Sequence, residues 1–554
     1  MPELQWIGKD KVINHHLDVP YHVLERKYAY CGGGENDPHI IPGSTDGHFS
    51  SADAALGNVD DRHAENKIIH GDNLLALKAL LPQYEGKVDC IYIDPPYNTG
   101  NEGWVYNDNV NDPRIKKWLG EVVGKEGEDL TRHDKWLCMM YPRLRLLHRL
   151  LAPTGVIAVS IDDDEMPSMR MLLDEIFGRR NFYAQVVWQK KYSPANDAKR
   201  FSDMHDYIIF YAKSDAFERN LIPRSEVNNS IYKYDDQDGR GPYASDNLSV
   251  RTFSESGVYP ITNPNTGEVF NPPAGRVWSF PQERMQELLA DNRIFWGAKG
   301  TAGPRLKRYL SEIQQGVVPV TWWPHEFAGH NDGARKEIRA LFGTVGSFDT
   351  PKPTLLLEKI FQICGNKNAL ILDSFAGSGT TAHAVLNLNK QDGGNRRFIL
   401  CEMMDYADTI TAERVKRVID GYGEGNRAVE GTGGSFSYYE LGEPLMIDTE
   451  LNPDVPLERI REYIWFTDTG EVYRAESAKV YPYFLGHSSL GVAYFFVFDP
   501  HAPTVLNRDL LASVPTECAA DSYVIYADTC VLSEQELLAH NITFKKIPRD
   551  ITRL

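Results

Sequence analysis

The amino-acid sequence predicts an α/β protein whose core is a mostly parallel, doubly wound sheet, interrupted by an inserted domain and followed by an α+β domain. Three observations predict this fold class. Apolar runs of strand length alternate with amphipathic stretches from residue 67, the alternation stops between about 190 and 345, and it resumes at residue 355. Because alternating strands and helices cover both faces of a parallel sheet, an insertion between two such stretches splits one sheet.

The first stretch has the pattern of one half of such a sheet. Residues 67–70 and 88–93 are apolar runs of strand length, and the amphipathic residues 74–81 between them predict a helix. Residues 136–151 carry leucines at three- and four-residue spacing, which indicates a second helix. A Pro-Thr-Gly turn then leads into a buried strand at 156–160.

The insertion has a different character. Aromatic residues, basic residues and turn signals such as Asn-Gly and Pro-Gly sequences alternate there, which predicts short strands and loops. The α/β pattern returns with a helix at 355–364 and strands at 369–372 and 397–401. These elements complete the sheet that the first stretch begins.

The chain is therefore expected to divide into five segments. The first is a loop-rich arm, because its Gly, Ser and Asp residues mark turns, and the last is a separate folded domain with its own apolar runs. The segments are an N-terminal arm (1–65), the first half of the sheet domain (66–189), the insertion (190–345), the second half (346–440) and a C-terminal domain (441–554).

Composition restricts the class of protein. The chain has 554 residues, of which 42% are hydrophobic, so it can bury a large core. It contains no signal-like N-terminus and no apolar run long enough for a membrane span, so we expect a cytoplasmic protein without membrane contact. The seven cysteines are dispersed and form no C-x-x-C pair, so we expect neither a disulfide framework nor a bound metal.

Charge is distributed unevenly along the chain. The net charge of -18 argues against non-specific coating of nucleic acid, which needs clustered cations. Residues 179–213 nevertheless hold seven basic and three acidic residues, and we interpret this stretch as a local basic face, although an ordinary solvated surface is the alternative. Residues 441–554 hold 17 acidic and 9 basic residues, which favours contact with a protein partner or subunit, or a structural role, over contact with phosphate.

The first candidate site is the turn Asp94, Pro95, Pro96 and Tyr97, which follows the predicted strand 88–93. In an open parallel sheet this position is the carboxyl edge, where ligands bind. Two prolines stiffen the turn and remove two donors, so the Asp94 carboxylate and the Pro95 carbonyl can accept both hydrogens of one amino group. Tyr97 offers a flat face on which a planar base can stack. The alternative is a Pro-Pro turn capped by an aspartate.

The second candidate site is the glycine-rich turn between a predicted strand and a helix at residues 373–381. Glycines there allow a ligand to approach the backbone. Glu402 ends the next strand, 23 residues after Gly379, where an acidic side chain can bind a ribose. The turn lacks the G-x-G-x-x-G and Walker patterns, which argues against dinucleotide or triphosphate binding.

Together these motifs resemble those of the β class of amino-directed DNA methyltransferases, in which a D-P-P-Y segment precedes the target-recognition domain and an F-x-G-x-G loop follows it. The resemblance covers about residues 65 to 440, and the phrases D-P-P-Y-N-T-G and D-S-F-A-G-S-G-T-T look especially like modification subunits of type III restriction systems. It implies the doubly wound methyltransferase fold, S-adenosylmethionine as cofactor and adenine N6 in duplex DNA, after base flipping, as the target.

The resemblance also assigns roles to individual residues. The catalytic motif is matched by Asp94, Pro95, Pro96 and Tyr97, and the cofactor site by Asp72, Lys352, Asp373, Phe375, Gly377, Gly379, Thr380 and Glu402. Thr350 and Pro353 resemble the segment that closes over the methionine end of the cofactor. One departure is Ser374, where the family commonly has proline, which should loosen the turn slightly.

The insertion is expected to select the DNA sequence, with Lys190, Lys191, Lys199 and Arg200 as DNA-binding residues. His205, in the segment that introduces it, is more plausibly a hydrogen-bonding loop residue than a general base, because this reaction needs no strong base. The resemblance further allows a homodimer and a restriction subunit as partners. Two alternatives stay open: an N4-cytosine methyltransferase, which usually has serine in place of Asp94, and a catalytically idle DNA-reading subunit.

Overall fold

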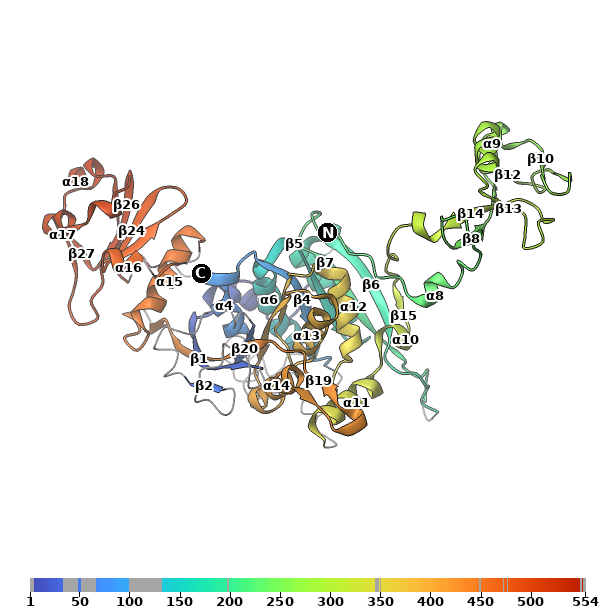
Figure 1. The fold of residues 1–554 in the computed structure, drawn as a ribbon. Coiled ribbons are helices and arrows are strands. Elements are labelled where there is room, and N and C mark those ends of the chain that lie inside the picture. The colour runs from blue at the N-terminus through green and yellow to red at the C-terminus, as the bar shows by residue number, and fades with distance from the viewer. Residues whose placement is uncertain are drawn as a thin grey trace. The chain divides into compact units, whose positions relative to one another are not determined.

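A computed structural model gives the structure of the chain (Figure 1). It describes residues 4–32, 48–50, 66–98, 132–196, 199–343, 348, 350–447, 450–471, 473–475, 477–548 and 551. The chain forms two compact units, one built from residues 1–220 and 320–554 and the other from Leu221–Pro319.

The larger unit is organised around an 11-stranded sheet. In spatial order its strands are β15 (Trp322–Trp323), β6 (Phe182–Gln189), β7 (His205–Ala212), β5 (Leu151–Ile161), β4 (Val88–Ile93), β16 (Leu370–Asp373), β17 (Arg397–Glu402), β3 (Lys67–His70), β20 (Ser435–Pro444), β1 (His22–Cys31) and β2 (His48–Ser50). The six strands from β5 to β20 run parallel, whereas β7 pairs antiparallel with both of its neighbours. The predicted mostly parallel α/β sheet is confirmed.

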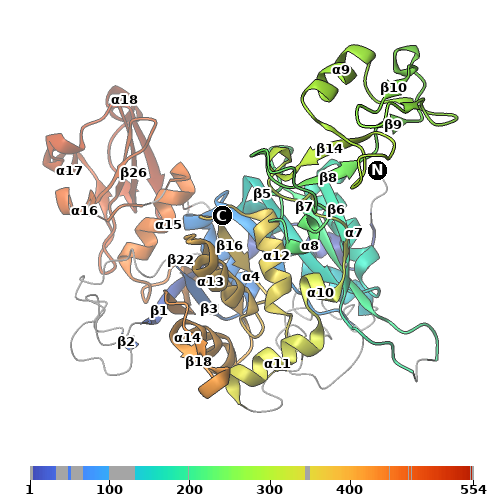
Figure 2. The ribbon, with the colours of Figure 1, turned by 45° about the vertical axis from the view of Figure 1, so that its right-hand side comes forward.

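Helices cover both faces of this sheet. On one face, α4 (Asn73–Tyr84), α6 (Arg132–Leu150) and α7 (Met166–Leu173) bury leucines and methionines against Ile91 and Ile93 of β4. On the other, α12 (Thr354–Cys364) lies beside α13 (Thr380–Asp392) (Figure 2), and the Phe361 ring meets Tyr92 edge-on at 6.5 Å. Successive β4 residues thus point to opposite faces, as a doubly wound sheet requires.

Before the C-terminal segment, the described part of this unit also contains further helices and a small hairpin. They are α1 (Lys9–Val12), α2 (His15–Asp18), α10 (His325–Ala328), α11 (Asn331–Phe342), α14 (Glu413–Asp420), β18 (Gly421–Tyr422) and β19 (Val429–Glu430). Among the described residues, no helix has both the length and the apolar character to cross a bilayer.

The described part of the N-terminal arm contains a strand that its composition did not predict. Residues 22–31 form β1, which pairs antiparallel with β20 more than 400 positions later, for example Tyr30 with Phe436. The loop-rich expectation for residues 33–47 and 51–65 lies outside the described residues. Because a strand at this place depends on a distant partner, local sequence patterns did not indicate it.

The smaller unit, Leu221–Pro319, has the short strands and turns expected of the insertion. Its elements are α8 (Glu226–Asn229), β8 (Tyr243–Asp246), β9 (Ser249–Val250), β10 (Ile261–Thr262), β11 (Val269–Phe270), β12 (Val277–Trp278), α9 (Gln282–Ala290), β13 (Ile294–Phe295) and β14 (Arg305–Tyr309). Its own apolar core includes Trp278, Leu288 and Trp296. The unit is narrower than the expected range 190–345, because β7, α10 and α11 belong to the larger unit.

The C-terminal segment is an α+β fold with a four-stranded sheet in the order β23-β24-β26-β28. Its elements are β21 (Met446–Ile447), β22 (Glu450–Leu451), α15 (Leu457–Thr469), α16 (Ser477–Val480), β23 (Phe484–His487), β24 (Val492–Phe496), β25 (Val505–Leu506), α17 (Arg508–Ser513), β26 (Ser522–Ala527), β27 (Thr529–Cys530), α18 (Glu534–Ala539) and β28 (Ile542–Lys546). The expected boundary at residue 441 falls inside β20, and Tyr21 and Val23 of the arm pack in one cluster with Ile464 of α15.

Candidate active site

Four neighbouring parallel strands end at one edge of the sheet, and each has a predicted site residue at its end or directly after it. Asp94 follows β4, the glycine turn follows β16, Glu402 ends β17, and Asp72 follows β3. These strands are adjacent in the order β4, β16, β17 and β3, so the predicted catalytic turn and the predicted cofactor residues lie side by side. This is the edge at which open α/β sheets bind their ligands.

The turn after β4 is held from behind. The indole nitrogen of Trp136, on α6, donates to the Pro96 carbonyl at 2.7 Å. Trp136 and both prolines are buried, so the turn has little freedom to move. Asn98, which follows Tyr97, is also buried and adopts a left-handed backbone with φ of 59°. Asparagine tolerates this conformation better than most residues, because its short amide side chain can form a hydrogen bond with the nearby backbone.

A buried carboxylate fixes Asn98. Glu165 is fully buried, and its Oε1 accepts from the Asn98 amide at 2.6 Å and contacts Nδ1 of His133 at 2.7 Å. Sequence reasoning missed both Glu165 and His133. The available signal was the acidic run at 162–165, which directly follows strand β5, the neighbour of β4.

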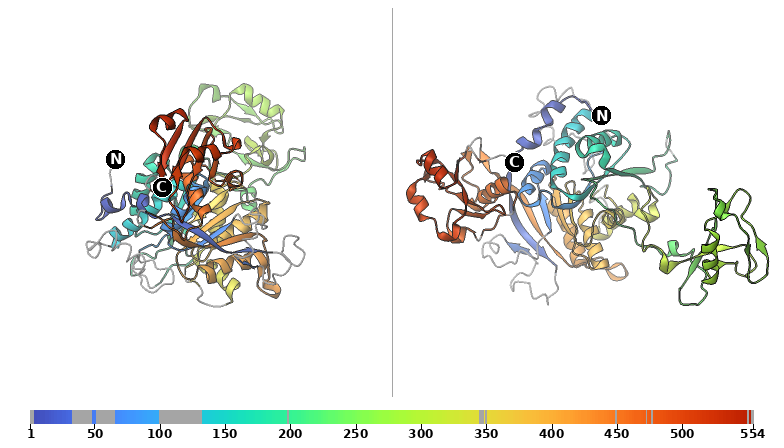
Figure 3. Two further views of the ribbon diagram at one scale, coloured as in Figure 1. Left: turned by 90° about the vertical axis from the view of Figure 1, so that its left-hand side faces the viewer. Right: turned by 90° about the horizontal axis from the view of Figure 1, so that it is seen from above.

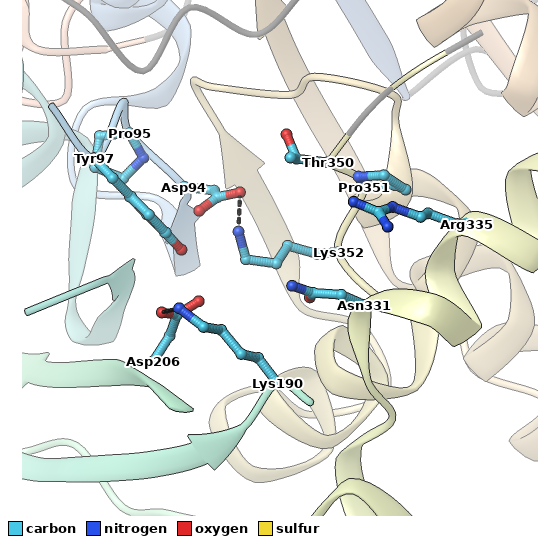
Figure 4. A pocket seen from close by; sticks show the side chains of 10 residues that line it. All are labelled: Asp94, Pro95, Tyr97, Lys190, Asp206, Asn331, Arg335, Thr350, Pro351 and Lys352. Atoms are coloured by element: carbon cyan, nitrogen blue, oxygen red, sulfur yellow. Dashed lines mark hydrogen bonds and ion pairs between the residues drawn. The ribbon is translucent and has the colours of Figure 1, made fainter. Parts of the chain in front are cut away.

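A cavity of about 110 Å³ opens in front of the turn (Figure 4). Its lining residues are Asp94, Pro95, Tyr97, Lys190, Asp206, Asn331, Arg335, Thr350, Pro351 and Lys352. The Lys352 ammonium lies 2.5 Å from Asp94 Oδ2 and 4.9 Å from the centre of the Tyr97 ring. In Figure 4 the Tyr97 hydroxyl points into the space between Asp94 and Asp206.

An ion pair forms the opposite wall of this cavity. The Lys190 ammonium lies 2.7 Å from Asp206 Oδ1 and 2.7 Å from Asp203 Oδ2. Burial disfavours the charge of Lys190, but the two carboxylates outweigh that effect and raise its pKa to about 12. Lys190, predicted to bind DNA on the surface, is therefore a mostly buried cation of the cavity wall, with 12% of its side chain exposed.

The other three predicted DNA-binding residues have a different environment. Lys191, Lys199 and Arg200 are exposed in the connection between β6 and β7. His205 lies at the start of β7, where its Nε2 is 3.1 Å from the Tyr207 hydroxyl. His205 is hydrogen-bonded as expected, but it is a strand residue and not the loop residue that the sequence predicted.

The glycine turn after β16 depends on backbone conformations that favour glycine. Gly377 and Gly379 have φ of 52° and 79°. A Cβ at Gly379 would lie 3.0 Å from the Thr411 carbonyl oxygen, so the position is also sterically restricted. Asp373 accepts from the Phe375 amide at 3.0 Å and from the Thr381 hydroxyl at 2.5 Å, which closes the turn. Burial raises the pKa of Asp373 to about 7, although these two hydrogen bonds act to lower it.

Glu402 lies beneath the same turn. Its Oε2 accepts from the Gly377 amide at 2.7 Å, and its Oε1 accepts from the Met404 amide at 3.0 Å. Burial raises the pKa of Glu402 to about 7, although both backbone bonds favour the charged form. Glu402 is 3% exposed, and the pocket over the turn is lined by Gly377 but not by Glu402, Gly379 or Asp72.

Asp72 organises the neighbouring strand end. It caps α4 by accepting from the Leu74 amide at 2.7 Å, and the buried Arg143 lies 3.3 Å from it. The adjacent Asn73 donates to the Ser374 carbonyl at 2.9 Å. This bond joins the start of α4 to the glycine turn. It is made at Ser374, the position where the class that the sequence resembles commonly has proline.

A buried arginine, also missed from the sequence, supports the turn from the other side. Arg414 of α14 is fully buried, and its guanidinium donates to the hydroxyls of Ser378 and Thr380, at 2.9 and 2.7 Å. It also donates to the Thr354 hydroxyl at 3.2 Å. Because Thr354 follows the segment that carries Lys352, Arg414 links that segment to the glycine turn.

A second pocket lies over the glycine turn. Its lining residues are Tyr92, Asp94, Phe348, Thr350, Pro351, Lys352, Leu357, Asp373, Phe375, Ala376, Gly377, Ser378, Thr380 and Thr381. Asp94, Thr350, Pro351 and Lys352 line both pockets, so the two are separated by a single layer of residues. The described residues contain no group of three or more metal-ligating side chains.

Comparison with known proteins identifies relatives. A family of N6/N4 methyltransferases, described as DNA methylase, matches residues 88–413. The StyLTI Mod subunit of a type III restriction-modification enzyme from Salmonella typhimurium LT2 is 36% identical over 412 residues, which cover 70% of this chain and 61% of that protein. The type II methyltransferase M.KpnI of Klebsiella pneumoniae is 34% identical over 359 residues, 61% of this chain and 80% of that protein.

More distant relatives include the DNA adenine methyltransferase YhdJ of Escherichia coli K12, 21% identical over 63% of this chain and 86% of that protein. Among solved structures, the M1.HpyAVI–SAM complex matches 63% of this chain and 98% of its own with a TM-score of 0.29 and 15% identity. The chain spans about 61% of the length of the StyLTI Mod subunit.

Proposed function

Because the chain belongs to the N6/N4 family of S-adenosylmethionine-dependent DNA methylases, we propose that it methylates the N6 amino group of adenine in duplex DNA. The observation that carries this proposal is the wall that two pockets share. One pocket lies over the glycine turn and the other lies in front of the Asp94 turn, and Asp94 and Lys352 line both. A methyl donor in the first pocket would therefore face an amino group in the second.

The chemistry of the donor set fits S-adenosylmethionine. Gly377 lines the pocket and lets a ligand approach the backbone, and Glu402, which accepts from the Gly377 amide, is the acidic group that would bind the ribose hydroxyls. Carboxylates of Asp94 and Asp373 line the pocket that would hold the cationic sulfonium. Bound S-adenosylmethionine supplies an electrophilic methyl group.

Asp94 and Pro95 would activate the target. An exocyclic amino nitrogen is a poor nucleophile because its lone pair is delocalised into the ring. The Asp94 carboxylate and the Pro95 carbonyl can each accept one amino hydrogen, which draws the lone pair out of conjugation. Trp136 occupies the neighbouring Pro96 carbonyl and keeps the turn in place. One carboxylate oxygen of Asp94 can stay with Lys352 while the other accepts from the base.

The front cavity would hold a base that has left the double helix. Chemistry at N6 needs such extrusion, since the atom is out of reach inside a duplex. The Tyr97 ring provides a stacking surface, and the Lys190 ammonium provides a donor for a ring nitrogen on the opposite wall. Both features suit a neutral, flat, hydrogen-bonding ligand.

Adenine is favoured over cytosine by two observations. Position 94 is aspartate, where cytosine-directed enzymes of the resembling class usually have serine. The relatives include a protein named as a DNA adenine methyltransferase. Two alternatives are an N4-cytosine enzyme and a subunit that reads DNA without catalysis.

One experiment separates these possibilities. The purified chain is incubated with genomic DNA and methyl-labelled S-adenosylmethionine, and the DNA is digested to nucleosides for mass spectrometry. Label in N6-methyladenine is expected. Label in N4-methylcytosine would reassign the target, and no label with intact cofactor binding would point to an idle subunit. Sequencing of the methylated DNA then gives the recognition site.

The type III Mod relatives suggest a partner as well. We propose that the chain acts in the cytoplasm as the modification subunit of a restriction-modification system, as a monomer or a homodimer, and that a restriction subunit binds it. The acidic C-terminal domain is the candidate for such protein contacts, because its charge disfavours phosphate. The insertion would select the DNA sequence.

A further inference from the structure

The connection between β6 and β7 carries an unusually exposed aromatic side chain. Phe201 is 101% exposed, the highest value of any large hydrophobic residue in the described part of the chain. The connection extends away from the sheet in Figures 1 and 3. A phenylalanine gains stability from burial, so a ligand that covers this ring would gain the stabilisation that the free chain leaves unused.

Hydrogen bonds at the base of the connection tie it to the front cavity. The Lys190 amide donates to the Met204 carbonyl at 3.0 Å, and the Lys190 ammonium, in the cavity wall, lies 2.7 Å from Asp203. Further out, the Ala195 amide donates to the Ser202 hydroxyl at 2.8 Å. Phe201 is two residues from Asp203, so their Cα atoms are at most about 7 Å apart.

The charge around Phe201 indicates what kind of partner it meets. Lys199 and Arg200 directly precede it, Lys191 lies at the start of the connection, and all three are exposed. Cations flanking an apolar tip suit a DNA backbone, whose phosphates bind the cations while the apolar group enters the base stack. An apolar protein surface would leave these charges without partners.

We propose that Phe201 is a wedge that enters the DNA stack at the place the target base vacates, with Lys199 and Arg200 on the flanking phosphates. The inference rests on the proposed base-flipping methyl transfer. A base that leaves the stack opens a gap between its neighbours, and an aromatic ring can fill it by stacking. The wedge thereby favours the extruded state, in which the base occupies the cavity lined by Tyr97 and Lys190.

The test compares two DNA substrates that contain the recognition site found by sequencing. One is a fully paired duplex, and the other has an abasic site opposite the target base, so extrusion breaks no base pair. Phe201→Ala should lower kcat/KM on the paired duplex on the order of tenfold, the size of one stacking interaction. On the abasic duplex it should approach the wild-type value. Phe201→Trp should retain activity on both.

The control is Leu490→Ala, which removes another strongly exposed apolar side chain from the C-terminal domain and should leave both rates unchanged. Wild-type rates for Phe201→Ala on the paired duplex would overturn the wedge and would indicate that Phe201 contacts a protein partner instead. An equal loss on both substrates would also overturn it, because the defect would not concern extrusion. Failure of the wild-type chain to methylate either substrate would overturn the proposed function itself.

Discussion

At the scale of single residues, the assignment depends most on Asp94. Asp94→Ala should abolish methyl transfer, with a fall of at least about a hundredfold, because it removes the acceptor that activates the amino group. Cofactor binding should be weakened but not lost, because Asp94 also lines the cofactor pocket beside Lys352 while Glu402 and the glycine turn stay intact. Methyl incorporation and calorimetry measure the two effects. Near-wild-type turnover of Asp94→Ala would place catalysis elsewhere. Asp94→Asn keeps one acceptor, so its turnover should lie between those of Asp94→Ala and the wild type.

Glu165 offers a test of how the catalytic turn is held. Glu165→Ala should lower kcat with little change in the KM for S-adenosylmethionine, because Asn98 loses its buried acceptor and the turn loosens. Glu165→Gln keeps the Oε1 atom that bonds both Asn98 and His133, so it should restore most of the activity. If Gln and Ala variants were equally impaired, positioning through Oε1 would be wrong.

Asp373 predicts a pH dependence of stability. Burial raises its pKa to about 7, so between its ordinary value and pH 7 the folded chain keeps a proton that the unfolded chain releases. The free energy of unfolding therefore falls as pH rises through this window, by up to about 1.4 kcal/mol per unit. Asp373→Asn cannot ionise; its amide oxygen can still accept from the Phe375 amide, and its NH2 group can donate to the Thr381 hydroxyl oxygen. Its Tm relative to wild type should therefore rise from pH 5 to 7 and then level off.

The matched control for that measurement is Asp392→Asn. Arg396 lowers the pKa of Asp392, so this carboxylate is ionised in both states above pH 5. Its Tm difference from wild type should be flat from pH 5 to 8. A flat difference for Asp373→Asn as well would contradict a raised pKa.

The sequence could predict residues that chemistry marks locally. Asp94, Gly377 and Glu402 each end or follow an apolar strand, and their types match the ligand groups expected there. Glu165 and Arg414 could not be predicted in this way. Glu165 contacts Asn98, 67 positions away, and Arg414 contacts Ser378, 36 positions away. Such contacts form only once the sheet brings the segments together.

At the scale of elements, the glycine turn joins a strand to a helix and tolerates few side chains. Gly377→Val should abolish S-adenosylmethionine binding, because it adds a branched side chain to a residue with φ of 52° that lines the cofactor pocket. Calorimetry measures the affinity.

Gly393→Val is the control for backbone strain. Gly393 ends α13 with φ of 65° and has open space around it, so the substitution has a similar conformational cost, about 1–2 kcal/mol, away from the pocket. It should lower Tm and leave cofactor affinity unchanged. Equal loss of affinity in both variants would mean that strain, and not contact, explains the Gly377 result.

Most strands and helices of the sheet follow from periodicity. The predicted helix 355–364 is α12 at Thr354–Cys364, and the predicted strand 88–93 is β4 at Val88–Ile93. The elements at the borders of segments were harder to assign. β1 pairs with β20, and β7 joins the main sheet although it lies within the expected insertion, because strand pairing is decided by distant partners as well as by local pattern.

At the scale of the whole molecule, the segment boundaries are the least predictable feature. Composition changes near residue 441, but β20 continues to Pro444 and the arm residues Tyr21 and Val23 share a core with α15. Contact between distant segments thus makes the C-terminal domain part of the larger unit. A chain truncated before the C-terminal domain has to retain β20. Without α15 it would still expose the apolar side chains of Tyr21 and Val23.

Charge at this scale leads to a prediction about DNA binding. The molecule carries -18 overall, so affinity for DNA has to come from local cations, and Lys191, Lys199 and Arg200 are the exposed ones of the β6–β7 connection. Replacing all three by alanine should weaken DNA binding and reduce the slope of log K against log salt by about 0.9 for each phosphate that the variant no longer neutralises. Affinity for S-adenosylmethionine should not change.

Lys190 is left intact in this variant, because its replacement would leave Asp203 and Asp206 without their cation in the cavity wall. Arg508→Ala is the control, since it removes an exposed cation from the acidic C-terminal domain and should leave the slope unaltered. Titrations of DNA at several salt concentrations give the slopes. An unchanged slope for the triple variant, together with a reduced slope for Arg508→Ala, would move the DNA-binding face from the β6–β7 connection to the C-terminal domain.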